Sequence, residues 1–137
     1  MVGLLTIEDA KSESCKEIDH QGDQCVRIAK RVLDNPEPGY REYKTSSLIA
    51  GEFAEMGIPF EERIAITGVK GILDTGRPGP TVAVIGELDS HIVRGHPNSD
   101  PETDAAHACG HHTQLGMLLA VAKGIQAPGV MDILAGR

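Results

Sequence analysis

The stretch TVAVIGELD, residues 81–89, is an apolar and largely β-branched run that ends in two carboxylates. Because residues 81–86 are apolar almost throughout, they predict a strand over 81–88 in the middle of a sheet that is covered on both faces. Glu87 and Asp89 lie at the carboxyl end of that strand, where open α/β sheets bind their ligands. The stretch therefore predicts both a buried sheet and the position of a functional site.

Helical patterns lie on both sides of this strand. Apolar residues at a mostly 3.6-residue spacing predict helices over residues 14–34, 42–56 and 113–125. Ser12 or Ser14 is the expected cap of the first helix, and Thr45 or Ser46 stands near the start of the second. Residues 131–134 predict one further helical turn. The helices and the strand together indicate an α/β domain.

Two shorter β-branched runs precede the central strand. Residues 60–66 and 69–74 predict strands, with a turn between them at Thr67 and Gly68. Residues 89–108 are polar and contain two prolines, so they predict a long loop. Long loops in compact domains are often functional.

Composition excludes several classes of partner. The 137 residues are the length of one domain. Lys and Arg number 13 against 20 Asp and Glu, and the net charge of −7 argues against nucleic acid or an anionic membrane as the main partner. No apolar run is long enough to span a membrane, and residues 1–11 do not resemble a secretory signal. Three cysteines are an odd and sparse set, which predicts a reducing, cytoplasmic location.

The metal-binding residue types are concentrated in one part of the chain. Cys109 and His111 are separated by one residue and precede a helix, whose N-terminus favours a thiolate. A thiolate and an imidazole at this spacing are suitable Zn²⁺ ligands, although a buried cysteine beside a hydrogen-bonded histidine is the plain alternative. Neighbouring residues favour the metal site, namely Glu87, Asp89, His91, His96, His107 and His112.

The HACGH stretch at residues 107–111 resembles the signature of the aminoacylase-type metallo-amidohydrolases, which include hydrolases of indole-acetyl-amino acids, N-acyl amino acids and p-aminobenzoyl-glutamate. The NPEPGYREYKT stretch at residues 35–45 is similar to the segment before this family's second helix. Residues 56–58 and 79–83 also fit. The GELD stretch at residues 86–89, with His96-Pro97 and the DPET stretch at 100–103, looks most like the aminobenzoyl-glutamate branch.

This resemblance implies the front part of a zinc-peptidase-like three-layer α/β/α catalytic domain, with its sheet incomplete in this chain. It implies a dinuclear Zn²⁺ or Mn²⁺ hydrolase in which metal-activated water cleaves the amide bond of a small N-acyl or dipeptide-like substrate. By match to the motif, Cys109 and His111 would be metal ligands, and Glu87 and Asp89 would orient the ligands. His112 stands where relatives often carry Asp or Asn, so no ligand role is transferred to it.

The family's catalytic glutamate, its other ligands and its dimerisation domain are expected further along the chain than residue 137. Residues 1–13 are therefore interpreted as a variable tail and residues 14–137 as the N-terminal part of the catalytic domain. We expect these 137 residues alone to be inactive and to bind metal weakly, and the complete enzyme to be a homodimer. The alternative is a truncated, non-enzymatic module that binds a metal or a partner.

Overall fold

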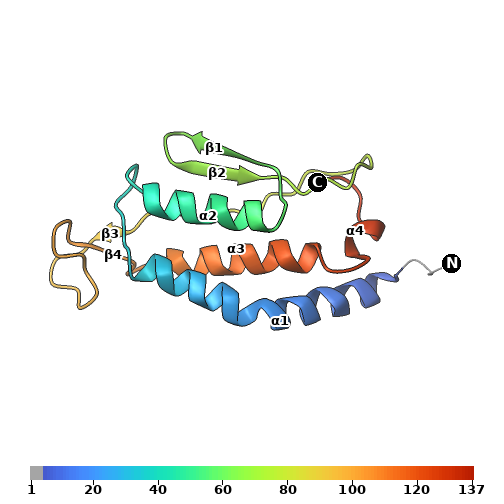
Figure 1. The fold of residues 1–137 in the computed structure, drawn as a ribbon, viewed down its shortest axis with the longest axis horizontal. Helices are drawn as coiled ribbons and strands as arrows, with labels where there is room; N and C mark the ends of the chain where they lie inside the picture. The colour runs from blue at the N-terminus through green and yellow to red at the C-terminus, as the bar shows by residue number, and fades with distance from the viewer. Residues whose placement is uncertain (1–4) are drawn as a thin grey trace.

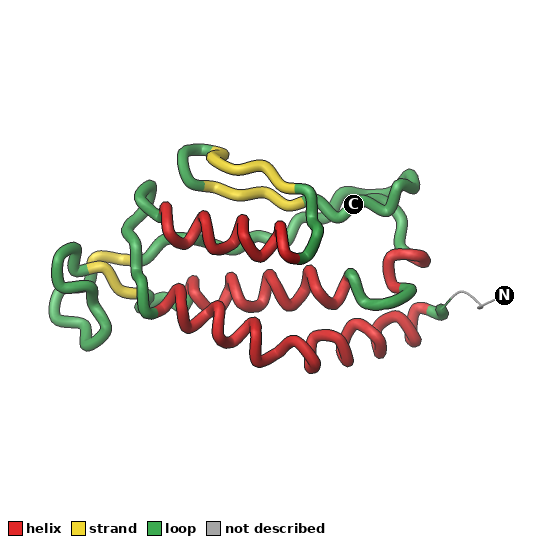
Figure 2. The backbone as a smooth tube through the Cα atoms, in the orientation of Figure 1, coloured by secondary structure: helices red, strands yellow, loops and turns green. Residues whose placement is uncertain are grey.

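The computed structural model describes residues 5–137 as a mixed α/β fold (Figures 1 and 2). Its helices and strands are, in chain order, α1 (Ile7–Leu33), α2 (Tyr43–Glu55), β1 (Phe60–Ile64), β2 (Gly68–Gly71), β3 (His91–Ile92), β4 (Ala105–Ala106), α3 (His111–Ile125) and α4 (Val130–Ile133). The long helices α1 and α3 lie side by side, and the β1–β2 hairpin packs on α2 (Figure 1). Within residues 5–137, no helix combines the length and the hydropathy that crossing a bilayer requires.

The first helix begins earlier than its apolar pattern predicts. Thr6 Oγ1 accepts a hydrogen bond from the Asp9 amide (3.1 Å), and the Asp9 carboxylate accepts one from the Thr6 amide (3.1 Å). This capping box starts the helix at Ile7, so the predicted start at residue 14 with a serine cap is wrong. Residues 7–13, which were expected in the tail, are the first two turns of α1, and residues 1–4 lie outside the described residues.

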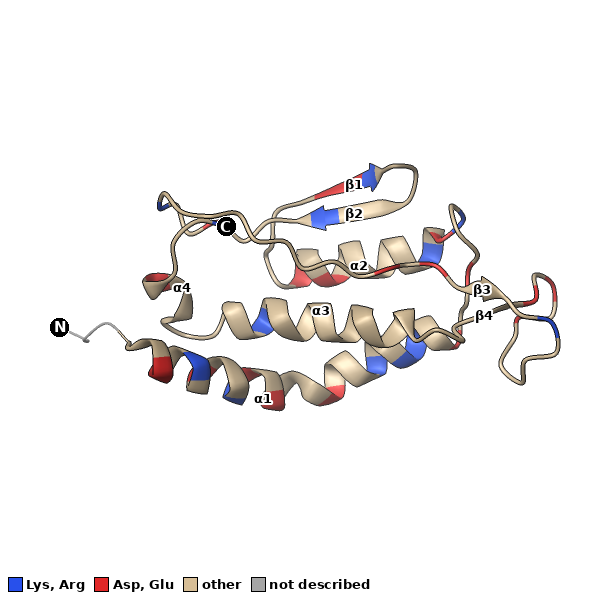
Figure 3. Ribbon diagram, turned by 180° about the vertical axis from the view of Figure 1, so that it is seen from behind, with Lys and Arg blue, Asp and Glu red and all other residues tan. Residues whose placement is uncertain are grey.

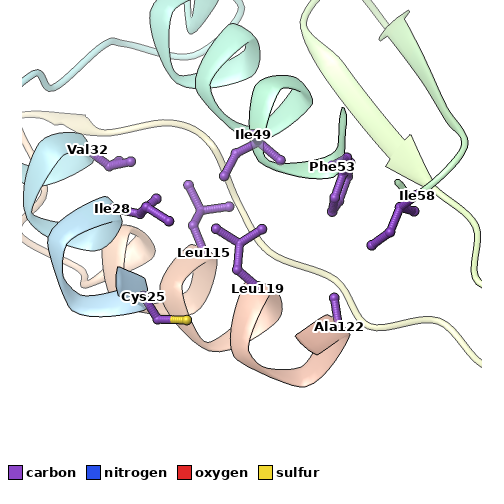
Figure 4. Packing of buried hydrophobic residues seen from close by; sticks show 9 residues of the cluster. All are labelled: Cys25, Ile28, Val32, Ile49, Phe53, Ile58, Leu115, Leu119 and Ala122. Atoms are coloured by element: carbon purple, nitrogen blue, oxygen red, sulfur yellow. The ribbon is translucent and has the colours of Figure 1, made fainter. Parts of the chain in front are cut away.

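Helices α1 and α3 approach closely at two glycines of α3. A Cβ atom at Gly116 would lie 3.1 Å from Ala29 Cβ and 3.2 Å from the Cys25 carbonyl oxygen. A Cβ atom at Gly124 would lie 2.9 Å from Ile18 Cδ1. The absent side chains therefore allow the two helices to bury their apolar faces against each other. Figure 4 shows the resulting core of Cys25, Ile28, Val32, Ile49, Phe53, Ile58, Leu115, Leu119 and Ala122.

The β1–β2 hairpin confirms the two short predicted strands in part. Its strands are antiparallel, with Phe60 opposite Gly71 and Ile64 opposite Gly68. The second strand ends at Gly71, earlier than the predicted residue 74. A Cβ atom at Gly71 would lie 3.1 Å from both Ile58 and Phe53, so this glycine lets the hairpin sit close against the core.

The predicted central strand is wrong for the described part of the chain. Residues 81–88 are extended, but they belong to neither of the two antiparallel sheets, β1–β2 and β3–β4. Val82 is 73% exposed and Ile85 is 83% exposed. The physical reason is that a strand buried on both faces needs hydrogen-bonded neighbours. Within residues 5–137, the one main-chain hydrogen bond of residues 81–88 runs from Val82 N–H to the Arg137 carbonyl oxygen, and the adjacent Pro80 carbonyl oxygen accepts from Arg137 N–H. The structure is mixed α/β, and the three-layer arrangement is not present within residues 5–137.

The polar loop over residues 89–108 is more structured than predicted. Its two ends pair as β3 and β4, with His91 opposite Ala106 and Ile92 opposite Ala105. A parallel bridge joins Pro38 to Ser90. The start of the loop is thereby fixed next to the start of α2, which positions the candidate site.

The first prediction concerns the amides of residues 83–85. Within residues 5–137 these amides have no backbone hydrogen-bond partner, so we expect them to exchange with solvent deuterium much faster than the amides of Leu115 and Leu119 in α3. Hydrogen-exchange mass spectrometry at low protein concentration measures both. Protection of residues 83–85 equal to that of α3 would show that this segment is paired in solution.

The second prediction compares two helical glycines. A Cβ atom at Gly51 in α2 meets nothing within 4 Å, so Gly51→Ala should stabilise the protein by about 1 kcal/mol through helix propensity. Gly116→Ala brings the same gain in helix propensity, but its new methyl group would lie against the backbone of α1. We expect the free energy of unfolding of the Gly116→Ala variant to be about 1–3 kcal/mol lower than that of the Gly51→Ala variant. Urea unfolding of the two variants gives the difference, and equal stabilities would contradict the close packing of α1 and α3.

Candidate metal centre

His111 lies between the two carboxylates at the end of the extended segment. It is the first residue of α3 and is 8% exposed. Its Nδ1 atom lies 2.8 Å from the Asp89 carbonyl oxygen and 3.1 Å from Asp89 Oδ1, and its Nε2 atom lies 3.0 Å from Glu87 Oε2. Figure 3 shows acidic residues along the segment that leads into β3. The structure therefore brings together three of the four residues to which the family motif assigns a role, namely Glu87, Asp89 and His111.

The hydrogen-bond acceptors around the ring define its chemistry. Both nitrogens of His111 face oxygen atoms, and a neutral imidazole carries only one proton. We assign that proton to Nδ1, because Nδ1 faces both the carbonyl and the carboxylate of Asp89. Nε2 then points its lone pair toward Glu87, so Nε2 is the ring nitrogen that would bind a metal ion. A histidine held in this way through one nitrogen is typical of a metal ligand.

Glu37 holds the segment that carries these carboxylates. The amide and the hydroxyl of Ser90 both donate to the Glu37 carbonyl oxygen, at 2.9 and 2.8 Å. The Glu37 carboxylate accepts hydrogen bonds from the amides of Lys44 and Thr45, at 3.0 and 2.8 Å, in the first turn of α2. The N-cap residue of α2 is Glu42, whose own side chain makes no capping hydrogen bond. A carboxylate from the preceding loop fills that role, and it also suits the positive end of the helix.

Cys109 lies two residues before His111, just ahead of α3. It is exposed, and Gly110 follows it in a left-handed conformation (φ +86°) that starts α3. Within residues 5–137, no group of three or more His, Cys, Asp and Glu side chains is arranged to hold a metal ion. The ligand role of Cys109 remains a prediction from the sequence motif.

A second pair of histidines lies beside His111. His107 is 6% exposed, and its ring centroid lies 5.5 Å from that of His112. Burial, together with the neighbouring His112 and His111, lowers the pKa of His107 to about 4, although Asp89 and Glu37 act in the opposite direction. Burial also lowers the pKa of His112. Both rings are therefore expected to be neutral at pH 7, which is the form that binds metals.

The remaining two histidines of the segment differ in their surroundings. The ring centroid of His91 lies 5.7 Å from that of His111, so His91 borders the cluster. His96 Nδ1 accepts a hydrogen bond from the Asn98 amide within a turn of the loop. The concentration of histidines in this part of the sequence indicated that their rings lie near one another, but it did not show which rings are buried.

The donor set of the cluster fits a borderline divalent cation such as Zn²⁺. Imidazole nitrogens suit Zn²⁺, and an adjacent thiolate at Cys109 would add to this preference. His111 Nε2 faces a carboxylate, and His107 has two buried nitrogens that contact no partner within the described residues. A four-coordinate site would need further ligands, because within residues 5–137 no three such side chains are arranged to hold an ion.

The chain is similar to known amidohydrolases and carboxypeptidases. It is 38% identical over 104 residues to IAA-amino acid hydrolase ILR1-like 2 of Arabidopsis thaliana, covering 74% of this chain and 24% of the relative. It is 36% identical over 119 residues to thermostable carboxypeptidase 2 of Saccharolobus solfataricus, covering 82% and 29%. It is 30% identical over 109 residues to hippurate hydrolase of Campylobacter jejuni, covering 77% and 28%. No family model matches the chain.

These relatives confirm the family that the HACGH stretch suggested. The chain spans only about a quarter of their length. The matches show that the chain belongs to the family of amidohydrolases and carboxypeptidases that contains these enzymes.

Proposed function

We propose that the chain supplies part of the metal site of an enzyme that hydrolyses the amide bond of N-acyl or aminobenzoyl amino acids, such as p-aminobenzoyl-glutamate. The observation that carries the proposal is the placement of His111, with Asp89 on one ring nitrogen and Glu87 facing the other. The names of the relatives support the substrate class, because they describe hydrolases of amino acid conjugates and of hippurate.

The residues of this chain would have different roles at the metal site. His111 Nε2 and the Cys109 thiolate would hold a divalent cation, Zn²⁺ or Mn²⁺, while Asp89 keeps the His111 ring in one tautomer and orientation. Glu87 would bind or orient on the Nε2 side. A cation held there would supply Lewis-acid activation of water and of the scissile carbonyl. The catalytic base, further ligands, the complete three-layer domain and a dimer interface are proposed for the longer protein.

A second candidate function is a module that binds a partner. The exposed apolar side chains of Val82, Val84 and Ile85 favour it, because within residues 5–137 the amides of residues 83–85 have no backbone partner and another strand could pair with them. In that case the chain associates through residues 81–88 and has no catalytic role.

The third prediction tests the proposed ligands. Co²⁺ titrated into the purified chain should give a thiolate-to-cobalt charge-transfer band in the near ultraviolet. Cys109→Ser should remove this band, because no thiolate then reaches the metal. His111→Gln should weaken Co²⁺ binding by at least about tenfold, because a ligand is lost.

Exposed Cys15 in α1 provides the matched control. Cys15→Ser should leave the cobalt spectrum unchanged, and circular dichroism verifies that each variant is folded. A charge-transfer band that survives in the Cys109→Ser variant would contradict the proposed ligand.

The fourth prediction concerns hydrolysis. The chain alone, with Zn²⁺ or Mn²⁺, should release no amine from hippurate or p-aminobenzoyl-glutamate, because the proposed base and further ligands are not among its residues. A chimera in which it replaces the matching stretch of Campylobacter jejuni hippurate hydrolase should hydrolyse hippurate, and Cys109→Ala in that chimera should abolish turnover. Steady turnover by the chain alone would refute the proposal that its residues form only part of the active site. A folded, metal-loaded chimera without activity would refute the proposed role in catalysis.

A further inference from the structure

The buried ring nitrogens of His107 and His112 contact no hydrogen-bonding group within the described residues. The atoms concerned are both nitrogens of His107 and Nδ1 of His112. A buried polar atom without a partner costs about 1–3 kcal/mol, and native proteins usually satisfy such atoms with water or an ion. Three such atoms on two adjacent rings therefore mark a position where water or an ion can bind.

The spacing of the two rings fits a shared cation. Zn²⁺ lies about 2.0–2.1 Å from an imidazole nitrogen and so about 3.2 Å from the ring centroid, which puts the centroids of two ligating rings about 5 Å apart at a tetrahedral angle. The centroids of His107 and His112 are 5.5 Å apart, with the ring planes inclined at 60°. The rings are therefore neither stacked nor too distant to share one ion.

The surroundings favour a cation over an anion or an apolar group. His111, the chain neighbour of His112, contacts the carboxylates of Glu87 and Asp89, so negative charge lies beside this pair of rings. Unprotonated imidazoles are good ligands for Zn²⁺, Ni²⁺ and Cu²⁺, whereas Mg²⁺ and Ca²⁺ prefer oxygen atoms. Both ring nitrogens of His111 already contact Asp89 or Glu87. His111 is therefore not the hydrogen-bond partner of the buried nitrogens of His107 and His112.

We propose that His107 and His112 form a two-histidine site for a divalent cation that prefers imidazole, with Zn²⁺ as the first choice, beside the Cys109–His111 position and with ligands of its own. The two rings supply two of the coordination positions, and water completes the shell. The site goes beyond the proposed hydrolase function, because it depends on the contacts of these two rings and not on catalysis.

The test follows the histidine rings directly. Long-range proton–nitrogen NMR spectra of the full chain, labelled with ¹⁵N-histidine, are recorded during a Zn²⁺ titration. We expect the ring nitrogens of His107 and His112 to shift on binding and to keep this response in a Cys109→Ser, His111→Gln double variant. His107→Gln and His112→Gln assign the resonances, and each should weaken binding at this site by at least about tenfold.

The exposed His20 in α1 provides the control, because His20→Gln should leave every Zn²⁺ response unchanged. If the buried His107→Gln variant does not fold, the unmodified chain and the His112→Gln variant still decide the question. Ring nitrogens of His107 and His112 that do not move at saturating Zn²⁺ would overturn the proposal and leave an ordered water as the ligand. Loss of their response in the Cys109→Ser, His111→Gln variant would also overturn it, because the site would then not be separate.

The outcomes for the two proposals are distinguishable. A thiolate-to-cobalt band, together with ring nitrogens of His107 and His112 that do not shift on addition of Zn²⁺, supports only the hydrolase site. Zn²⁺ shifts at His107 and His112 without a thiolate band support only the second site.

Discussion

The close packing of α3 on α1 is the constraint on which the rest of the structure depends. Gly116 and Gly124 leave room for the backbone and side chains of α1, and the shared core of both helices then covers one side of α2. Because α3 is held rigidly in this way, its first residue, His111, has a fixed position at one end of the helical layer. The geometry of the candidate metal centre is therefore a consequence of helix packing some distance from it.

A single residue of the proline-rich loop connects this core to the site. Glu37 uses its carboxylate to cap α2 and its carbonyl oxygen to hold Ser90, so the segment with Glu87 and Asp89 is tied to a helix of the core. Glu42 makes a separate connection between the start of α2 and the hairpin turn, because its buried carboxylate accepts hydrogen bonds from Thr67 and from the amide of Tyr40. The contacts of Glu37 with Ser90 hold the two carboxylates near His111 although residues 81–88 are in no sheet.

Sequence reasoning succeeded where structure is local. The second helix and the third helix lie within one or two residues of their predicted bounds, because apolar periodicity and flanking turn residues act over a few positions. The start of α1 was missed because its capping box precedes the apolar pattern. The strand at 81–88 failed because pairing depends on distant partners. The meeting of His111 with Asp89 and Glu87 was predictable from a segment end and a helix start, whereas the burial of His107 and the double role of Glu37 depend on tertiary contacts.

The pairing of α1 with α3 also has a kinetic consequence. The chain that separates them, residues 34–110, takes about 4–15 s to synthesise at the usual rates of translation. During that interval the apolar stripe of α1, including Ile28 and Val32, lacks the helix that covers it. α2 and the hairpin that packs on it are close in sequence and can form in the meantime. The core between α1 and α3 can therefore form only after α3 has been synthesised. Until then, α1 is an exposed amphipathic segment of the kind that chaperones recognise.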